Sequence, residues 1–136
     1  MSFVVDASVT LAWCFEDEAR PYAESVLDRL RGTQAMVPAI WPLEVANALL
    51  VAERRGRLAE AQTARLVELL ASLPIDVDTE GLAHAWDTIV ALGREHRLSA
   101  YDAGYLELAM RQGLPLATQD EGLKKVAGRA GIALVE

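Results

Sequence analysis

The amino-acid sequence predicts an α/β domain with a mostly parallel sheet, and three features lead to this fold class. Short apolar runs alternate with longer segments of helical periodicity along the whole chain. Glycines stand just beyond four of the predicted helices, at Gly32, Gly56, Gly113 and Gly131. The 136 residues suit one domain, residues 1–136, with enough buried surface for a core.

The elements follow in order along the chain. The predicted strands are short β-type runs at residues 3–5, 35–37, 75–77, 114–117 and 132–135. The predicted helices lie between or after them, at residues 20–31, 42–54, 59–72, 80–95, 101–112 and 121–130. We expect helices to cover both faces of this sheet. Open sheets of this kind place their sites outside the carboxyl ends of the strands.

Composition limits the protein classes that remain. With 52% hydrophobic and 24% charged residues the chain is typical of soluble globular proteins, and no stretch approaches the ~20 apolar residues of a membrane span. The first residues lead directly into a strand without the features of a signal peptide, and Cys14 is the single cysteine. We therefore expect a cytoplasmic protein without a membrane partner, in which Cys14 is a small buried hydrophobe.

Four acids occupy unusual positions. Asp6 ends an apolar strand in FVVDASV, and Asp120 follows the apolar run before it in LATQD. Glu44 and Asn47 are the polar residues of an otherwise apolar helical stretch and, three residues apart, share a face. Asp102 is the first charge of an apolar helix. All four acids therefore fall at strand-to-helix junctions or in first helical turns.

Each acid also has a purely structural explanation. Acids are favoured at helix N-termini, where they accept backbone N–H bonds and complement the helix dipole. Asp120 is a natural N-cap, and Ser99 with Asp102 resembles a capping box. Together, however, four acids at one sheet edge without a neighbouring Lys or Arg in sequence would repel one another unless a cation lay among them. Oxygen ligands of this kind suit Mg²⁺ or Mn²⁺.

Four segments in this order, VVDASV, PLEVANAL, LSAYDAGYLELA and LATQDEGL, resemble the PIN-domain ribonucleases, in particular the VapC-type toxins of VapBC toxin–antitoxin pairs. The likeness covers nearly the whole chain. It implies a PIN-like three-layer α/β/α fold with a mostly parallel five-stranded central sheet. By this resemblance Asp6, Glu44, Asp102 and Asp120 correspond to the catalytic metal-binding acids of the family, with Ser8 and Thr118 as nearby hydroxyls and Asn47 in support.

The resemblance implies a Mg²⁺- or Mn²⁺-dependent endoribonuclease that is the toxin of a type II pair, restrained by a VapB-type antitoxin. A divalent ion would also reconcile RNA binding with the net charge of −7, since the cation lies where the scissile phosphate goes. Lys124 and Lys125 are candidate RNA contacts close to Asp120. The segments at residues 13–20 and around Arg57 are candidates for RNA choice. Together with the resemblance, the apolar side of residues 42–72 predicts a homodimer.

Two other readings stay open. A receiver-type phosphoacceptor domain is also a small α/β protein with acids at strand ends, and Thr118 and Lys124 could be its Thr and Lys. It normally opens with paired acids before the phosphorylated Asp, a layout that Glu44 and Asp102 do not fit. A non-catalytic PIN-like binding module with capped helices is the other possibility. Metal titration distinguishes a nuclease from such a module.

Overall fold

The computed structural model describes residues 2–136 and has a four-stranded parallel sheet at its centre. The strands are β1 (Phe3–Val5), β2 (Ala35–Val37), β3 (Ile75–Val77) and β4 (Leu116–Ala117), in the order β3-β2-β1-β4. All three strand pairs are parallel, with Val4 of β1 opposite Met36 on one side and Leu116 on the other. The α/β class and the parallel sheet are confirmed.

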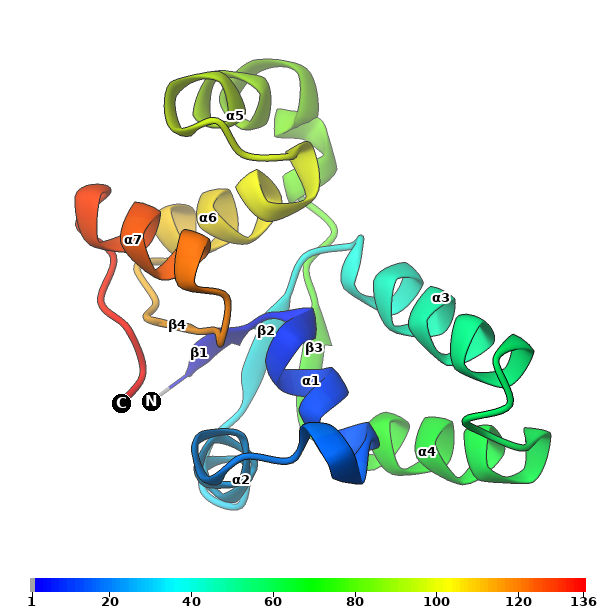
Figure 1. Cartoon of the computed structure of the whole chain (residues 1–136). Coiled ribbons are helices and arrows are strands. Elements are labelled where there is room, and N and C mark those ends of the chain that lie inside the picture. Colours follow the sequence, from blue (N-terminus) through cyan, green and yellow to red (C-terminus); the bar gives the residue numbers. More distant parts are fainter. Residues whose placement is uncertain (1) are drawn as a thin grey trace.

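Helices flank this sheet, as Figure 1 shows. The first group follows β1 and β2: α1 (Ala7–Cys14), the short η1 (Glu16–Glu18), α2 (Pro21–Arg29), α3 (Trp41–Arg54) and α4 (Glu60–Ser72). The second follows β3 and β4: η2 (Gly81–His84), η3 (Ala85–Ile89), α5 (Val90–His96), α6 (Ala100–Gln112) and α7 (Glu121–Arg129). The connections from β1 to β2 and from β2 to β3 run one way across the sheet, and the connection from β3 to β4 runs back the other way. Because all such crossovers are right-handed, the two groups of helices lie on opposite sides of the sheet.

The core forms where β1 meets the helices around it. Val4 and Val5 are fully buried, because a central parallel strand is covered on both faces. Helix α6 packs against β1 and is buried along most of its length, as its apolar sequence predicts. No helix in residues 2–136 combines the length and the apolar character needed to cross a bilayer.

The predicted fifth strand at 132–135 is wrong. Leu134 forms one isolated parallel bridge with Leu116, and the pairing does not continue as a β-ladder. The pairing does not extend toward the start of β4, because the Leu114 N–H donates to the Ala109 carbonyl (3.0 Å) at the end of α6. The backbone donor that a longer strand needs is therefore already used.

Two helical predictions also differ from the structure. The segment 80–95 is not one helix but a 3₁₀ turn, a π-type turn and α5 in succession. The Gly81 N–H donates to Asp78 Oδ2 (2.8 Å), which fixes the entry of this segment to the end of β3. Helix α1 was not predicted, because its sequence ASVTLAWC lacks the polar face that gives helical periodicity.

Candidate functional site

Asp6 lies at the carboxyl end of β1. The chain passes from β1 to β2 on one side and later reaches β4 on the other side, so the connections change direction at β1. Such a switch point is where open α/β sheets bind their ligands. The Asp6 side chain is the N-cap of α1: its Oδ1 accepts the Val9 N–H (3.1 Å) and the Ser8 hydroxyl (2.6 Å). Its Oδ2 accepts the Thr118 hydroxyl. Only 5% of Asp6 is exposed, and this burial raises its pKa, although the bonds from Ser8 and Thr118 oppose the shift.

The same two hydroxyls connect Asp6 to the loop that follows β4. The Asp120 N–H donates to Thr118 Oγ1 (3.0 Å), and the Gln119 N–H donates to Ser8 Oγ (3.0 Å). Ser8 and Thr118 therefore each accept one backbone bond and donate one bond to the same carboxylate. They lie beside the site, as the resemblance implied, and hold the loop against the end of β1.

Asp120 caps α7, as its position predicted. Its Oδ1 accepts the Gly122 N–H (2.9 Å) and the Leu123 N–H (3.3 Å). The side chain is exposed at the rim of the site. It lies close enough to raise the pKa of both Asp6 and Asp102. The capping role and proximity to the other acids therefore coexist at this residue.

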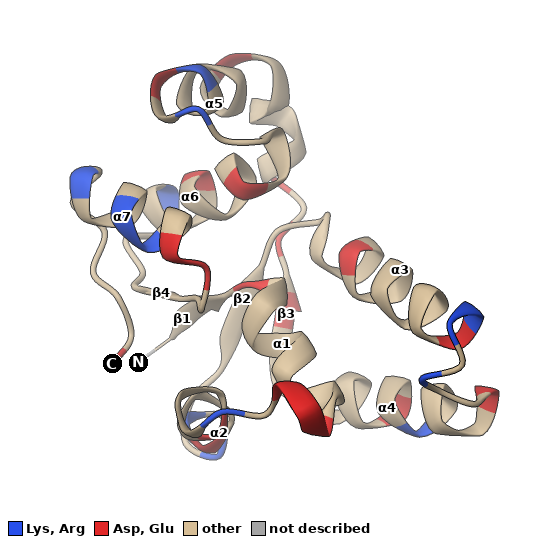
Figure 2. Ribbon diagram, in the orientation of Figure 1, with Lys and Arg blue, Asp and Glu red and all other residues tan. Residues whose placement is uncertain are grey.

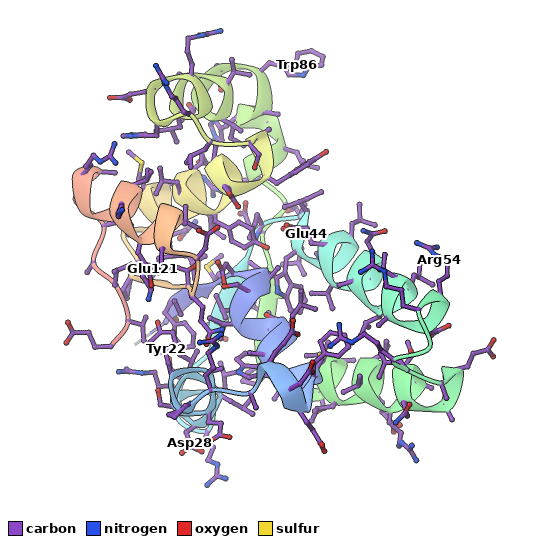
Figure 3. All side chains as sticks on the ribbon, in the orientation of Figure 1. Tyr22, Asp28, Glu44, Arg54, Trp86 and Glu121 are labelled. Atoms are coloured by element: carbon purple, nitrogen blue, oxygen red, sulfur yellow. The ribbon has the colours of Figure 1, made fainter. Side chains whose placement is uncertain are left out.

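Glu44 lies in the first turn of α3, where Pro42 fixes the backbone. Its Oε1 accepts the Tyr105 hydroxyl at 2.7 Å, so the side chain extends from α3 toward α6 (Figure 3). Partial burial raises the pKa of Glu44 despite this bond, and Asp102 and Asp6 add to the shift. Glu44 is thus a third carboxylate at the same site.

Only the backbone N–H of Asp102 takes part in the predicted capping box, and its carboxylate does not. The Ser99 hydroxyl accepts the Asp102 N–H (3.1 Å), which makes Ser99 the N-cap of α6. The carboxylate itself makes no hydrogen bond or ion pair to residues 2–136. Partial burial raises its pKa, and Asp120 raises it further. A half-buried carboxylate without a protein partner has hydrogen-bonding capacity left for a ligand.

The structure therefore brings all four predicted acids to one region. Figure 2 shows acidic segments at the first turns of α3, α6 and α7, while Lys and Arg lie at the far end of α3 and in the middle and at the end of α7. Within residues 2–136, no three His, Cys, Asp or Glu side chains lie close enough together to hold a metal ion between them. Carboxylates that stand apart in one region fit a hydrated hard ion, because Mg²⁺ keeps several waters and takes one or two carboxylates.

The other predicted site residues lie further out. Asn47 is exposed one turn along α3 from Glu44. Lys124 forms an ion pair with Glu121 (3.2 Å) on the same helix, and Lys125 is exposed. Burial, and to a smaller extent the charge of Glu18, raise the pKa of Cys14 to about 11. A thiol with a raised pKa is a poor nucleophile, because the reactive form is the thiolate.

Tyr105 and Trp41 are site-supporting residues that the sequence reasoning missed. The Trp41 Nε1–H donates to Thr10 Oγ1 (2.9 Å), and the Thr10 hydroxyl donates to the Asp6 carbonyl (3.0 Å). This path fixes the start of α3 relative to the end of β1. Their residue types could have indicated this role, because buried Tyr and Trp side chains need a hydrogen-bond partner.

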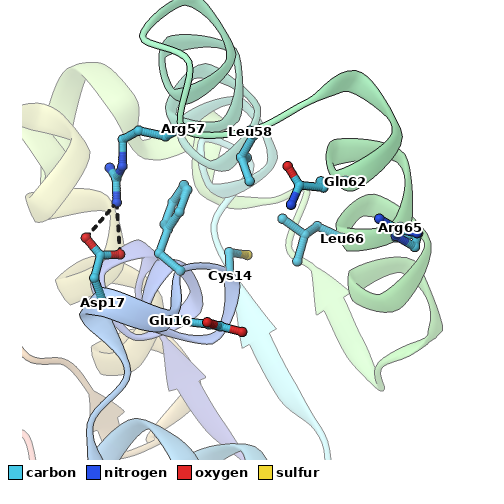
Figure 4. A pocket seen from close by; sticks show the side chains of 9 residues that line it. Cys14, Glu16, Asp17, Arg57, Leu58, Gln62, Arg65 and Leu66 are labelled. Atoms are coloured by element: carbon cyan, nitrogen blue, oxygen red, sulfur yellow. Dashed lines mark hydrogen bonds and ion pairs between the residues drawn. The ribbon is translucent and has the colours of Figure 1, made fainter.

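The two segments expected to influence RNA choice are in contact. Arg57, in the turn after α3, forms an ion pair with Asp17 (3.1 Å), and its guanidinium lies 4.5 Å from the centre of the Phe15 ring. Together with α4 they line an open pocket of about 550 Å³ (Figure 4), whose lining includes Leu58 and Arg65. This pocket lies beyond the C-terminal end of α1, whereas Asp6 lies at its N-terminal end.

Comparison with known proteins identifies the family. The PIN domain profile matches residues 3–129. The protein named ribonuclease VapC3 from Pyrobaculum aerophilum is 31% identical over 123 residues, which cover 90% of this chain and 92% of that protein. Its namesake from Mycobacterium tuberculosis is 34% identical over 124 residues, with 90% and 85% covered. The crystal structure of VapBC2 from Rickettsia felis bound to a promoter DNA fragment aligns with a TM-score of 0.71 at 10% identity, covering 99% of this chain and 98% of that one, and so shares the fold. The chain therefore belongs to the PIN domain family, within its VapC group.

Proposed function

We propose that this protein is a Mg²⁺- or Mn²⁺-dependent endoribonuclease that acts as the toxin of a type II toxin–antitoxin pair. The observation that carries the proposal is the convergence of Asp6, Glu44 and Asp102 at the sheet switch point, with Asp120 at the rim. After the larger effect of burial, Asp120 raises the pKa of Asp6 and Asp102, and Asp102 and Asp6 raise that of Glu44. No ion pair within residues 2–136 joins any of the four acids to Lys or Arg. The names of the VapC3 relatives support a ribonuclease.

Each residue has a distinct task in this proposal. The four acids hold the ion or ions, which would activate water and stabilise charge on the scissile phosphate. Ser8 and Thr118 keep Asp6 in place through the bonds described above. Asn47 supports the α3 side of the site. Lys124 and Lys125 contact RNA phosphates, and the pocket beside Arg57 contributes to the choice of RNA.

The proposed partners are RNA, a VapB-type antitoxin and a second copy of the chain. The solved VapBC2 assembly supports the antitoxin. Exposed apolar side chains on α3 and α4 support a homodimer: Leu43 is 66% exposed, and Leu50 and Val67 are each 51% exposed. We place the protein in the cytoplasm, where RNA and antitoxin are both available.

The test of this function is RNA cleavage by the purified chain and by D6N, with and without Mn²⁺. Asn has nearly the shape of Asp but lacks the charge, so D6N should remain folded and lose metal-dependent cleavage. D28N, on the exposed surface of α2, is the matched control and should cleave like the wild type. Cleavage that persists in D6N or in excess chelator would contradict the proposal.

The two alternatives give different results in the same experiments. A receiver-type domain would be phosphorylated at Asp6 by a small phosphodonor and would cleave nothing. A binding module would neither cleave RNA nor bind Mn²⁺ in calorimetry. The geometry disfavours the receiver, because the acids linked to Asp6 by charge, Asp120 and Glu44, come from the loop after β4 and the first turn of α3, and not from the end of its own strand.

A further inference from the structure

Tyr105 connects two helices of the acidic site, α6 and α3, although it carries no charge. It is 1% exposed and lies three residues after Asp102, on the same side of α6. Its hydroxyl donates to Glu44 Oε1 at 2.7 Å, across from α6 to α3.

The bond to Glu44 gives the Tyr105 hydroxyl a fixed direction. A tyrosine hydroxyl has one proton to donate and lone pairs that accept. Because an ionised carboxylate can only accept, the Tyr105 proton goes to Glu44. The Tyr105 ring cannot move, since it is packed in the core. The bond therefore fixes one oxygen of Glu44 in space.

Glu44 needs this restraint because its surroundings repel it. Asp102 and Asp6 both act unfavourably on its charge, and it forms no ion pair within residues 2–136. The side chain is only half-buried, so it could turn outward to water. Glutamate has several rotamers, and holding one of them costs conformational entropy. The Tyr105 bond offsets that cost before any ligand arrives.

We propose that Tyr105 is a positioning residue that occupies Oε1 of Glu44 and so presents Oε2 to the divalent ion. The inference rests on the proposed function, since it concerns the same acids. Tyr105 touches neither the ion nor the RNA in this arrangement. It acts through Glu44, as outer residues that orient metal ligands do.

The first experiment is Mn²⁺ binding by calorimetry with the full chain. Y105F removes one oxygen from the buried ring and should weaken Mn²⁺ binding by about 10-fold to 100-fold, the usual effect of losing such a residue. Y101F makes the same change one turn earlier on α6, where the ring is 58% exposed, and should bind like the wild type. Circular dichroism verifies that both variants are folded. If Y105F binds Mn²⁺ as tightly as the wild type, only the role of Tyr105 is overturned and the proposed function stands. If the wild type binds no Mn²⁺, both the proposed function and this inference are overturned.

The second experiment separates positioning from a general packing effect. In an E44Q background Tyr105 no longer has a charged ligand to orient, so E44Q and Y105F/E44Q should bind Mn²⁺ with equal affinity. This comparison holds even if Y105F alone does not fold, because E44Q removes the repelled charge. A further loss of affinity from Y105F in the E44Q background would overturn the proposal, since Tyr105 would then act on the site by another route.

Discussion

Thr118 Oγ1 donates a hydrogen bond to Oδ2 of Asp6, and this contact joins the carboxyl ends of the neighbouring strands β4 and β1. Both residues are almost fully buried. The same hydroxyl accepts the Asp120 N–H at 3.0 Å, so one threonine orients the deepest acid and the start of the α7 loop. A short chain of hydrogen bonds thus determines how the exposed acid is placed relative to the buried one.

Replacement of Thr118 by Val should destabilise the protein by about 2 kcal/mol, because it leaves a buried carboxylate oxygen without its donor. Urea unfolding followed by circular dichroism measures this difference. Thr63 provides the matched control: its buried Oγ1 has no hydrogen-bond partner in the described chain, so T63V should be neutral or slightly stabilising. Equal losses in both variants would indicate that the hydroxyl of Thr118 contributes nothing specific.

The acidic site should make the protein less stable as pH rises. Burial raises the pKa of Asp6, Glu44 and Asp102 above the ordinary values of 3.8 for Asp and 4.5 for Glu. Between those ordinary values and the raised ones the folded state holds more protons than the unfolded state, so the free energy of unfolding falls as pH increases.

D6N should weaken this decline and raise the melting temperature at pH 7, while millimolar Mn²⁺ should restore stability to the wild type. Differential scanning fluorimetry from pH 4 to pH 8 measures both effects. A wild-type melting temperature that rises steadily across this range would contradict the prediction.

The sequence indicated which acids lie in one region better than it indicated the bounds of the elements around them. The four acids could be found because each interrupts an apolar run, and a parallel sheet brings strand ends together whatever the exact element bounds. The α1 helix, the broken segment 80–95 and the absent fifth strand were not predicted, because hydrophobic periodicity carries no sign of them. Two of them depend on single short-range hydrogen bonds, from the Gly81 N–H to Asp78 and from the Leu114 N–H to Ala109, and such bonds leave no periodic pattern in the sequence.

Asp120 permits a separation of structural and metal-binding roles. D120A should cost about 1 kcal/mol, because it removes the cap that Gly122 and Leu123 donate to. D120N should retain nearly full stability, since Asn is an equally good N-cap, but should lose Mn²⁺ affinity with the charge. Urea unfolding and calorimetry on both variants test this. Wild-type Mn²⁺ affinity in D120N would show that Asp120 is a cap and nothing more.

A buried ion-pair cluster fixes the second helical group to the sheet. Arg111 near the end of α6 donates to Asp78 Oδ2 (2.6 Å), just after β3, and to Glu107 Oε2 (2.7 Å) on its own helix. Asp78 and Glu107 are 7% and 4% exposed. Although burial alone would raise the pKa of Asp78, the bonds from Arg111 and from the Gly81 N–H lower it below its ordinary value. The stabilisation from Asp78 is therefore present above pH 3.8 and lost as pH falls through the lowered pKa.

R111M should destabilise the protein by about 3 to 5 kcal/mol at pH 7, because two buried carboxylates lose their counter-charge while the aliphatic part of the side chain is retained. The loss in the free energy of unfolding should be smaller at pH 4 than at pH 7, because a buried carboxylate without its counter-charge takes up a proton instead of remaining charged. Urea unfolding at both pH values measures this change. R31M is the control, since the Arg31–Asp28 pair is exposed (87% and 72%) and should contribute little. A loss in R111M that is small, or equal at both pH values, would mean that Arg111 contributes by packing and not by charge.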